Sequence, residues 1–305
     1  MRLRLGRLRT PLYLFSEDLE VGYSYPWVRP PVDMYVLFLE PFSNFDGADV
    51  TWSRAFGSVD AEFKAFAGSM DGQFLEIDID VKRVAGFAAQ AQTGEFTFRY
   101  GFARNHSDIT LPGVQPAIDG FRFATTIDAE TFGGIDEYFS AHDQDYDYHG
   151  IAVQWERDEW MAVSEAFRFY GPEADWGFDG SGWYVSVARQ FGTLTPYYVR
   201  GAYETAIRQE IFDDINSTYV KYPVGLIPPL DTLRAGSLAG FQSRNVGQKT
   251  HTIGLRWDFH PRADVKLELQ HFEFLKGSTG HMLPQPDTYR TDAALLTSVI
   301  VDVVF

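Results

Sequence analysis

The amino-acid sequence predicts an all-β fold, a transmembrane antiparallel β-barrel with about twelve strands in this chain. Three observations support this prediction. Apolar and polar residues alternate with a period of two along segments of about ten residues throughout the chain. Short and long connections follow one another between these segments, which is typical of membrane barrels with short turns at one end and long loops at the other. The mean hydropathy is only −0.21, as expected when each strand carries apolar residues at every second position.

Charge and composition exclude several other classes of protein. The chain has 305 residues and a formal net charge of −16, which argues against nucleic-acid binding because that needs a basic surface. No run of about eighteen apolar residues is present, so the sequence predicts no transmembrane helix. The absence of cysteine excludes disulfides and thiolate metal sites. The first ten residues include arginines but no apolar core, and they do not form a signal peptide.

The predicted strands follow one another in hairpin pairs along a single domain, residues 1–305. The first strand covers residues 2–8, and the last covers residues 295–305 and ends on Phe305. The pairs between them are 47–57 with 61–68, 80–90 with 95–105, 148–156 with 159–170, 182–191 with 194–204, and 249–259 with 264–274. Longer segments connect the pairs: 10–46, and the expected external loops 106–145, 206–248 and 275–294.

Two of the external segments interrupt the strand pattern. Residues 113–143 have room for short helices, and residues 128–142 are the best helical candidate, although Gly133 and Gly134 weaken it. Residues 216–245 are expected to form a long loop that prolines stiffen. Loops of this length in a compact barrel are functional or mobile, and we expect the first to fold over the mouth.

The charges along each strand indicate which face points inwards. Trp257 and Phe259 share one face of their strand, and Arg256 and Asp258 share the other. An arginine or lysine that faces lipid at mid-depth costs roughly 2–4 kcal/mol, so the charged face is predicted to line a water-filled interior. The apolar face then contacts lipid, and a closed sheet leaves no strand edge unpaired.

Three stretches carry a resemblance to a known family: residues 6–31, residues 253–272 and the terminal Phe305. In these stretches the chain resembles the Gram-negative outer-membrane porins of proteobacteria. The resemblance implies passive diffusion of small hydrophilic solutes or ions through a channel, without a cofactor. It also implies an outer-membrane location, contact with membrane lipid and lipopolysaccharide, and a homotrimer. The last strand departs from the family pattern, because it lacks a glycine and has Val303 where an aromatic residue is common.

The resemblance also implies a longer protein. In porins of sixteen strands, the third external loop follows the fifth strand and folds into the lumen. If residues 10–46 are that loop, four strands and a signal peptide precede Met1, and the barrel has about sixteen strands. The alternative is a complete barrel of twelve strands.

We expect the 10–46 loop to constrict the pore, with Glu17, Asp18, Glu20 and Arg29 facing basic and acidic residues of the wall. In the alternative, the loop lies outside on the rim and water solvates these charges. The candidate wall residues are Arg7, Arg9, Asp49, Glu62, Lys64, Arg99, Arg200, Glu204, Arg256, Asp258, Lys266, Glu268 and Asp302. The alternation slips at Gly6, where a glycine bulge is expected.

Other kinds of site have weaker support in the sequence. Asp143, Asp145 and Asp147 have the spacing of a calcium loop, but Tyr148 replaces the required glycine and Gln154 the final glutamate. No G-x-S-x-G motif is present, and we expect no catalytic residue and no enzyme. The alternatives are a non-conducting outer-membrane barrel that acts as an adhesin or a membrane enzyme, and a soluble β-rich binding protein.

Overall fold

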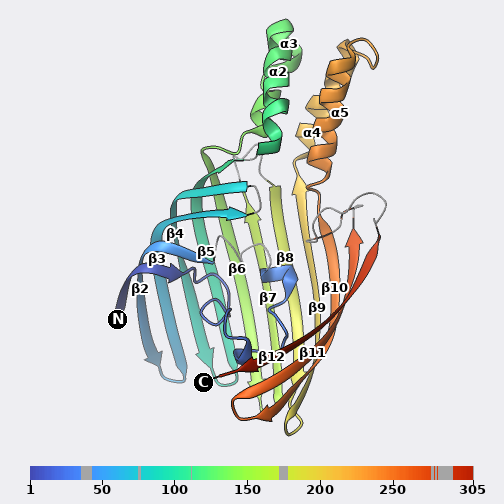
Figure 1. Ribbon diagram of the computed structural model, residues 1–305. Coiled ribbons are helices and arrows are strands. Elements are labelled where there is room, and N and C mark those ends of the chain that lie inside the picture. Colours follow the sequence, from blue (N-terminus) through green and yellow to red (C-terminus); the bar gives the residue numbers. More distant parts are fainter. Residues whose placement is uncertain are drawn as a thin grey trace.

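Twelve strands form one antiparallel sheet in the computed structural model, which describes residues 1–35, 43–74, 77–110, 112–171, 178–275, 278, 280 and 291–304 (Figure 1). Each strand pairs with the next one in the sequence. The strands are β1 Arg2–Arg9, β2 Asn44–Phe56, β3 Val59–Phe74, β4 Ile77–Thr93, β5 Phe96–Thr110, β6 Gln144–Arg157, β7 Trp160–Tyr170, β8 Phe178–Arg189, β9 Leu194–Ile207, β10 Gly247–His260, β11 Ala263–Leu275 and β12 Ala293–Val303. The predicted all-β fold class and strand number are confirmed.

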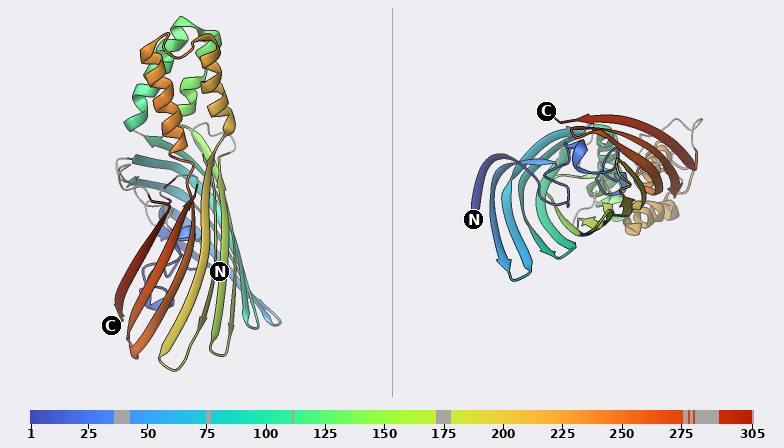
Figure 2. Two further views of the ribbon diagram at one scale, coloured as in Figure 1. Left: turned by 90° about the vertical axis from the view of Figure 1, so that its right-hand side faces the viewer. Right: turned by 90° about the horizontal axis from the view of Figure 1, so that it is seen from below.

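The sheet curls strongly, with β1 and β12 as its two edges in the described part of the chain (Figure 2). Short turns join the strands at one end, and the long excursions leave from the other end (Figure 1). Among the described residues, no helix is long and apolar enough to cross a bilayer. Phe305 and residues 281–290 of the predicted 275–294 loop lie outside the described residues.

The outer face of the sheet is apolar over most of its area. On β10, β11 and β12, Trp257, Leu267 and Val299 expose 49, 50 and 66% of their surface, whereas Lys266 on the opposite face is fully buried. This confirms the predicted faces of the last three strands. The β1–β2 pairing runs from Arg2–Thr51 to Arg9–Asn44 without a register shift, so Gly6 adopts a positive φ of 127° but no bulge forms there.

Helices fill the two longest excursions, as expected for residues 113–143, whereas a loop was expected for residues 216–245. Between β5 and β6 lie η3 (Pro112–Val114), α2 (Gln115–Ile127), α3 (Ala129–Phe132) and η4 (Ile135–Phe139), and between β9 and β10 lie α4 (Gln209–Lys221) and α5 (Pro228–Gln242). These helices stand together above the strand ends as a helical tower with its own apolar core (Figures 1 and 2). The strands extend further than expected, so the excursions cover residues 111–143 and 208–246 rather than 106–145 and 206–248.

The prolines of the second excursion begin a helix instead of stiffening a loop. Pro228 and Pro229 occupy the first turn of α5, where a missing backbone N–H leaves no helical hydrogen bond unmade. The two helical pairs are tied at their tips, because Asp128 accepts from Lys221 Nζ at 2.7 Å and from the Tyr222 hydroxyl at 3.0 Å. Hydrophobic periodicity along the sequence does not predict this bundle, because the apolar faces of its helices are buried only when the two excursions pack against each other.

The segment between β1 and β2 lies on the concave side of the sheet (Figure 2). It contains the short helices η1 (Gly22–Ser24) and α1 (Val32–Tyr35), and β2 begins at Asn44, three residues earlier than expected. We refer to its described residues, 10–35 and 43, as the inner loop. Leu12, Tyr13, Trp27, Met34 and Tyr35 of the inner loop are each at least 90% buried.

We expect Trp27→Ala to weaken the docking of the inner loop strongly. Trp27 exposes 1% of its surface, contacts the rings of Phe15, Tyr25 and Tyr184, and donates from Nε1 to Ser186 Oγ at 2.8 Å. Removing such a side chain costs about 3–5 kcal/mol. Limited proteolysis of the folded protein should then cleave within residues 10–35. Trp52→Ala on the outer face is the matched control and should leave the inner loop resistant.

Candidate functional site

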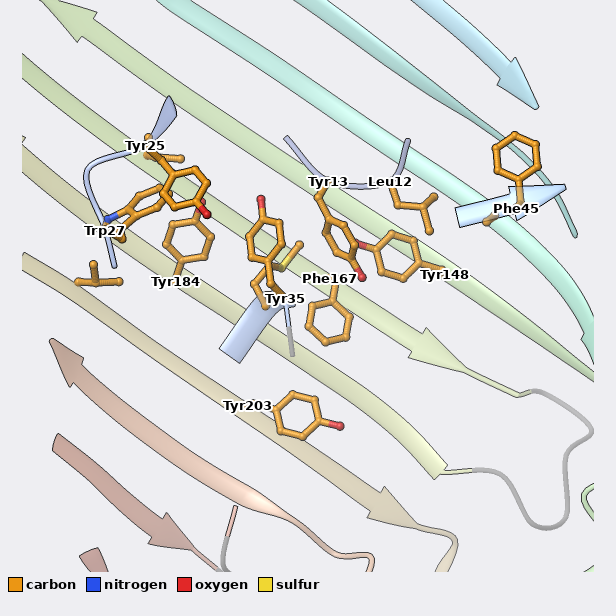
Figure 3. Close-up of a cluster of buried hydrophobic side chains, with 14 of the residues drawn as sticks. Leu12, Tyr13, Tyr25, Trp27, Tyr35, Phe45, Tyr148, Phe167, Tyr184 and Tyr203 are labelled. Atoms are coloured by element: carbon orange, nitrogen blue, oxygen red, sulfur yellow. The ribbon is translucent and has the colours of Figure 1, made fainter. Parts of the chain in front are cut away.

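An aromatic cluster joins the inner loop to the middle of the sheet (Figure 3). Tyr13 of the inner loop meets Tyr148 of β6 edge to face, with ring centroids 5.7 Å apart, and Trp27 meets Tyr184 of β8 in the same way at 5.8 Å. Tyr148 in turn stacks on Phe167 of β7 at 5.9 Å. Contacts of this kind stabilise one arrangement of the loop over others, because each pair adds about 0.5–1.5 kcal/mol beyond area burial.

Glu165 of β7 is the polar centre of this cluster. Its carboxylate accepts hydrogen bonds from the Tyr35 hydroxyl, from the Tyr184 hydroxyl at 2.7 Å and from the backbone N–H of Leu14 at 2.9 Å. The side chain is 2% exposed, so these three donors replace the water that a carboxylate requires. Glu165 is not among the site residues predicted from the sequence, where its only signal is a carboxylate that interrupts the apolar pattern of residues 159–170.

Asp33 fixes the other end of the inner loop. Its carboxylate accepts from Gln248 Nε2 at 2.7 Å and from the Thr250 hydroxyl, both on β10. Burial raises the pKa of Asp33 to about 6, and the two hydrogen bonds only partly oppose this shift. Gly182 and Gly201 face Asp33, and a Cβ at either position would collide with it. Glycine inside a predicted strand can therefore indicate, from the sequence alone, where the loop approaches the sheet closely.

Charged residues hold the inner loop to β1, β2 and β3. Glu17 accepts from Arg4 Nη2 at 3.1 Å and from Lys64 Nζ at 2.5 Å, and Arg4 also binds Asp49 at 2.5 Å. Burial raises the pKa of the Glu17 carboxyl, but the hydrogen bonds from Lys64 and Arg4 outweigh this effect and lower the pKa to about 2. Glu20 pairs with Arg9, the last residue of β1.

A second charged cluster holds the loop to β10, β11 and β12. Arg256 donates to the backbone oxygens of Tyr23 and Tyr25 at 2.8 and 3.2 Å, and Lys266 donates to that of Gly22 at 2.5 Å. Lys266 also lies 3.0 Å from Asp302, and Arg256 lies 2.8 Å from Asp258.

Arg29 completes this second cluster. It donates to Gln270 and Ser298 at 3.3 and 3.2 Å and lies 3.6 Å from Glu268. The inner loop thus contacts strands near both edges of the curled sheet.

The remaining candidate residues occupy different environments. Arg99 faces inwards and donates to Gln90 at 3.0 Å and to the backbone oxygen of Pro11 at 2.7 Å. Glu62 also faces inwards, where Ser53 donates to it at 3.2 Å. Asp18 is an exposed residue of the inner loop, between the paired Glu17 and Glu20.

Three predicted wall residues lie on the wrong face. Arg200 and Glu204 share the exposed outer face of β9 with Tyr198, while Tyr197, Val199 and Tyr203 are buried on the inner face. Arg7 pairs with Asp46 at 2.7 Å on the face opposite Asp49. The assignment for β9 was wrong because its apolar face packs against the inner loop, so the lipid-facing side is the one that carries the charges.

A polar cavity opens at the short-turn end of the sheet, below the inner loop. Its volume is about 560 Å³, and Tyr23 and Tyr25 of the loop form part of its lining. Its lining also includes Arg256 and four carboxylates: Glu156, Asp158, Glu159 and Asp258. The cavity therefore carries more acidic than basic side chains.

The calcium-like aspartates have other partners. Asp143 and Asp145 flank His106, at 2.9 Å from Nε2 and 2.8 Å from Nδ1, and Asp147 pairs with Arg104 at 2.6 Å. Within the described ranges, no group of three or more histidine, aspartate or glutamate side chains is placed to hold a metal ion.

Comparison with solved structures matches the curled sheet to Gram-negative barrels. OmpT of Vibrio cholerae, an outer membrane protein with its loop L8 deleted, aligns with a TM-score of 0.54 and 11% identity over 98% of this chain and 74% of its own. The anion-selective porin from Comamonas acidovorans aligns with a TM-score of 0.51 and 11% identity over 89% of this chain and 63% of its own. The chain has an outer-membrane β-barrel fold. The predicted outer-membrane location agrees with this fold.

No protein-family model matches the chain, and no curated protein matches it in sequence. The expectation that the chain is not an enzyme is wrong, because an enzymatic function is not excluded. The matched structures share only about 11% sequence identity with this chain, so they show a common outer-membrane β-barrel fold, and a fold alone does not decide whether a protein is an enzyme. Sharing this fold therefore does not rule out an enzyme.

We expect the docking of the inner loop to weaken as pH rises through about 6. The folded pKa of Asp33 lies above its ordinary value of 3.8, so the docked loop binds a proton more tightly than the released loop. Stability from this group is complete below about pH 4 and is lost by about pH 7. The rate of proteolysis within the inner loop, measured between pH 5 and 8, reports this pH dependence. We expect Asp33→Asn to remove most of it. An unchanged pH profile in that variant would contradict the assignment to Asp33.

Proposed function

We propose that the protein is an outer-membrane porin: a water-filled channel for passive diffusion of small hydrophilic solutes or ions, constricted by the 10–46 loop. The observation that carries the proposal is the inner loop on the concave side of the sheet, held by Glu17 at one end and by Arg29 near the other. A channel needs a narrow zone with fixed charges, and a loop anchored at both sides supplies one.

The paired charges around the inner loop set up a transverse arrangement of fixed dipoles. Arg4, Lys64 and Glu17 lie on one side, and Lys266, Asp302 and Arg29 on the other. Residues held in this way act as a rigid filter, because their side chains are already ordered by hydrogen bonds. Asp18 and Glu20 are the exposed charges beside them that a passing ion would meet.

The acidic cavity at the short-turn end favours cations. Three of its carboxylates, Glu156, Asp158 and Glu159, lie in or beside the β6–β7 turn, and the chain as a whole carries a net charge of −16. The anion preference in the name of the Comamonas porin belongs to that protein. A homotrimer, implied by the resemblance to porins, remains a prediction.

The alternative function is a non-conducting barrel that acts as an adhesin or a membrane enzyme. The observation that favours an adhesin is the helical tower, which has a separate core and projects beyond the strand ends (Figure 1). Phe123 and Ile127 on α2 expose 68 and 61% of their surface there.

Planar-bilayer recording of the refolded protein tests the channel. We expect stable ohmic steps, and a larger step in Trp27→Ala because the inner loop no longer narrows the path. Trp52→Ala should conduct as the unchanged protein does. A silent bilayer with correctly folded protein would support the adhesin or enzyme instead.

Ion selectivity tests the acidic cavity. We expect the triple variant E156Q/D158N/E159Q to lower the cation-to-anion permeability ratio by at least about twofold, because it removes three fixed negative charges from one mouth. The zero-current potential in a salt gradient measures the ratio. Glu204→Gln, which removes a charge from the outer face, is the control, and an equal change in both variants would contradict the assignment.

A further inference from the structure

Two similar three-residue clusters lie on the outer face of the sheet. The first consists of Tyr100 on β5, His149 on β6 and Arg168 on β7. The Tyr100 hydroxyl lies 2.8 Å from His149 Nδ1, and Arg168 is the direct ladder partner of His149. All three side chains reach the surface, and the Arg168 side chain is 66% exposed.

The second cluster has the same three residue types four strands further along the sheet, but its arginine lies on the same strand as its tyrosine, whereas Arg168 lies on the opposite side of His149 from Tyr100. It consists of Tyr198 and Arg200 on β9 and His251 on β10. The Tyr198 hydroxyl lies 2.7 Å from His251 Nδ1, and Arg200 is the direct ladder partner of His251. In both clusters the tyrosine is the ladder partner of an isoleucine two residues from the histidine, Ile151 or Ile253. A tyrosine–histidine hydrogen bond beside an arginine thus occurs twice on the outer face, which indicates that the two clusters share a role.

The clusters mark one boundary of the apolar outer surface. From each histidine towards the short turns, the outer face of the strand continues with exposed apolar residues: Ile151 at 59%, and Ile253 and Leu255 at 57 and 37%. Towards the helical tower, the outer face becomes polar, with Arg104 and Asp147 on one side and Lys249 on the other. A charged side chain on this face costs least at the membrane interface, roughly 0–1 kcal/mol.

The donors of each cluster are arranged to meet an anion. We assign the tyrosine hydroxyl as the donor to Nδ1, which leaves the histidine Nε2–H and the guanidinium as free donors. Arg200 has no ion pair among the described residues. Arg168 lies 3.5 Å from the exposed Asp179 and over the ring of Tyr170, 5.3 Å from its centroid. Glu204 and Glu273 also lie on this face nearer the tower, where Glu273 is the ladder partner of Lys249.

We propose that the Tyr100–His149–Arg168 and Tyr198–His251–Arg200 clusters bind the phosphate groups of lipopolysaccharide in the outer leaflet. The excursions that build the tower leave from the same end of the strands, which is the outside in barrels of this fold. Guanidinium groups bind phosphate through paired N–H donors, and the apolar surface below each cluster receives acyl chains of the same lipid. The proposal depends on the outer-membrane fold and not on conduction.

Native mass spectrometry of the refolded protein tests the proposal with bisphosphorylated lipid A as the probe. We expect R168Q/R200Q to weaken its binding about tenfold. The double variant R54Q/R189Q removes two arginines from the same outer face at the short-turn end, where they lie over aromatic rings. This matched control should change the affinity by less than about twofold.

Two further probes identify the ligand. Dephosphorylated lipid A should bind the unchanged protein about as weakly as bisphosphorylated lipid A binds R168Q/R200Q. Inorganic phosphate at millimolar concentration should not displace the lipid. Equal losses in both double variants, tight binding of dephosphorylated lipid A, or displacement by inorganic phosphate would each overturn the proposal. Channel recordings are independent of these outcomes, so a failure here leaves the porin proposal standing.

Discussion

The packing of the inner loop against the concave wall is the contact on which the rest of the structure depends. Trp27, Tyr35 and Tyr13 bury against β6, β7 and β8, and this burial places the backbone of a long connection inside the curl. A buried backbone must find hydrogen-bond partners. Glu165 accepts the N–H of Leu14, and Arg256 and Lys266 donate to the carbonyls of Tyr23 and Gly22.

The buried charges around the inner loop determine where the loop lies more than they add to the stability of the fold. The carboxylate of Glu165 and the ammonium of Lys266 are almost fully buried, and taking such groups out of water offsets much of the attraction to their partners. Their donors and acceptors nevertheless fit only one placement of the loop, because any shift leaves a buried charge unpaired. The same set of contacts fixes where Glu17 and Arg29 stand relative to the wall, and therefore the charges that a solute would meet.

Alternation along the strands predicts the sheet well, because lipid and water impose opposite demands on its two faces. It identifies the inward position of Lys266 and Glu268, but it fails on β9, where Tyr197 and Tyr203 are apolar and face inwards. Two separate partners, lipid outside and the inner loop inside, can bury an apolar face, and a local pattern does not distinguish them. The tower and the role of Glu165 depend on contacts between segments far apart in sequence, which no local window contains.

Labelling of single cysteines tests the covering of the wall by the inner loop most directly, because the natural chain has no cysteine. Ser186 on β8 is completely buried beneath Trp27, whereas Ser53 on β2 faces inwards but is exposed. With a water-soluble maleimide, we expect S53C to react readily and S186C to remain unlabelled in the folded protein. Equal rates for the two variants would show that the loop does not lie against the wall.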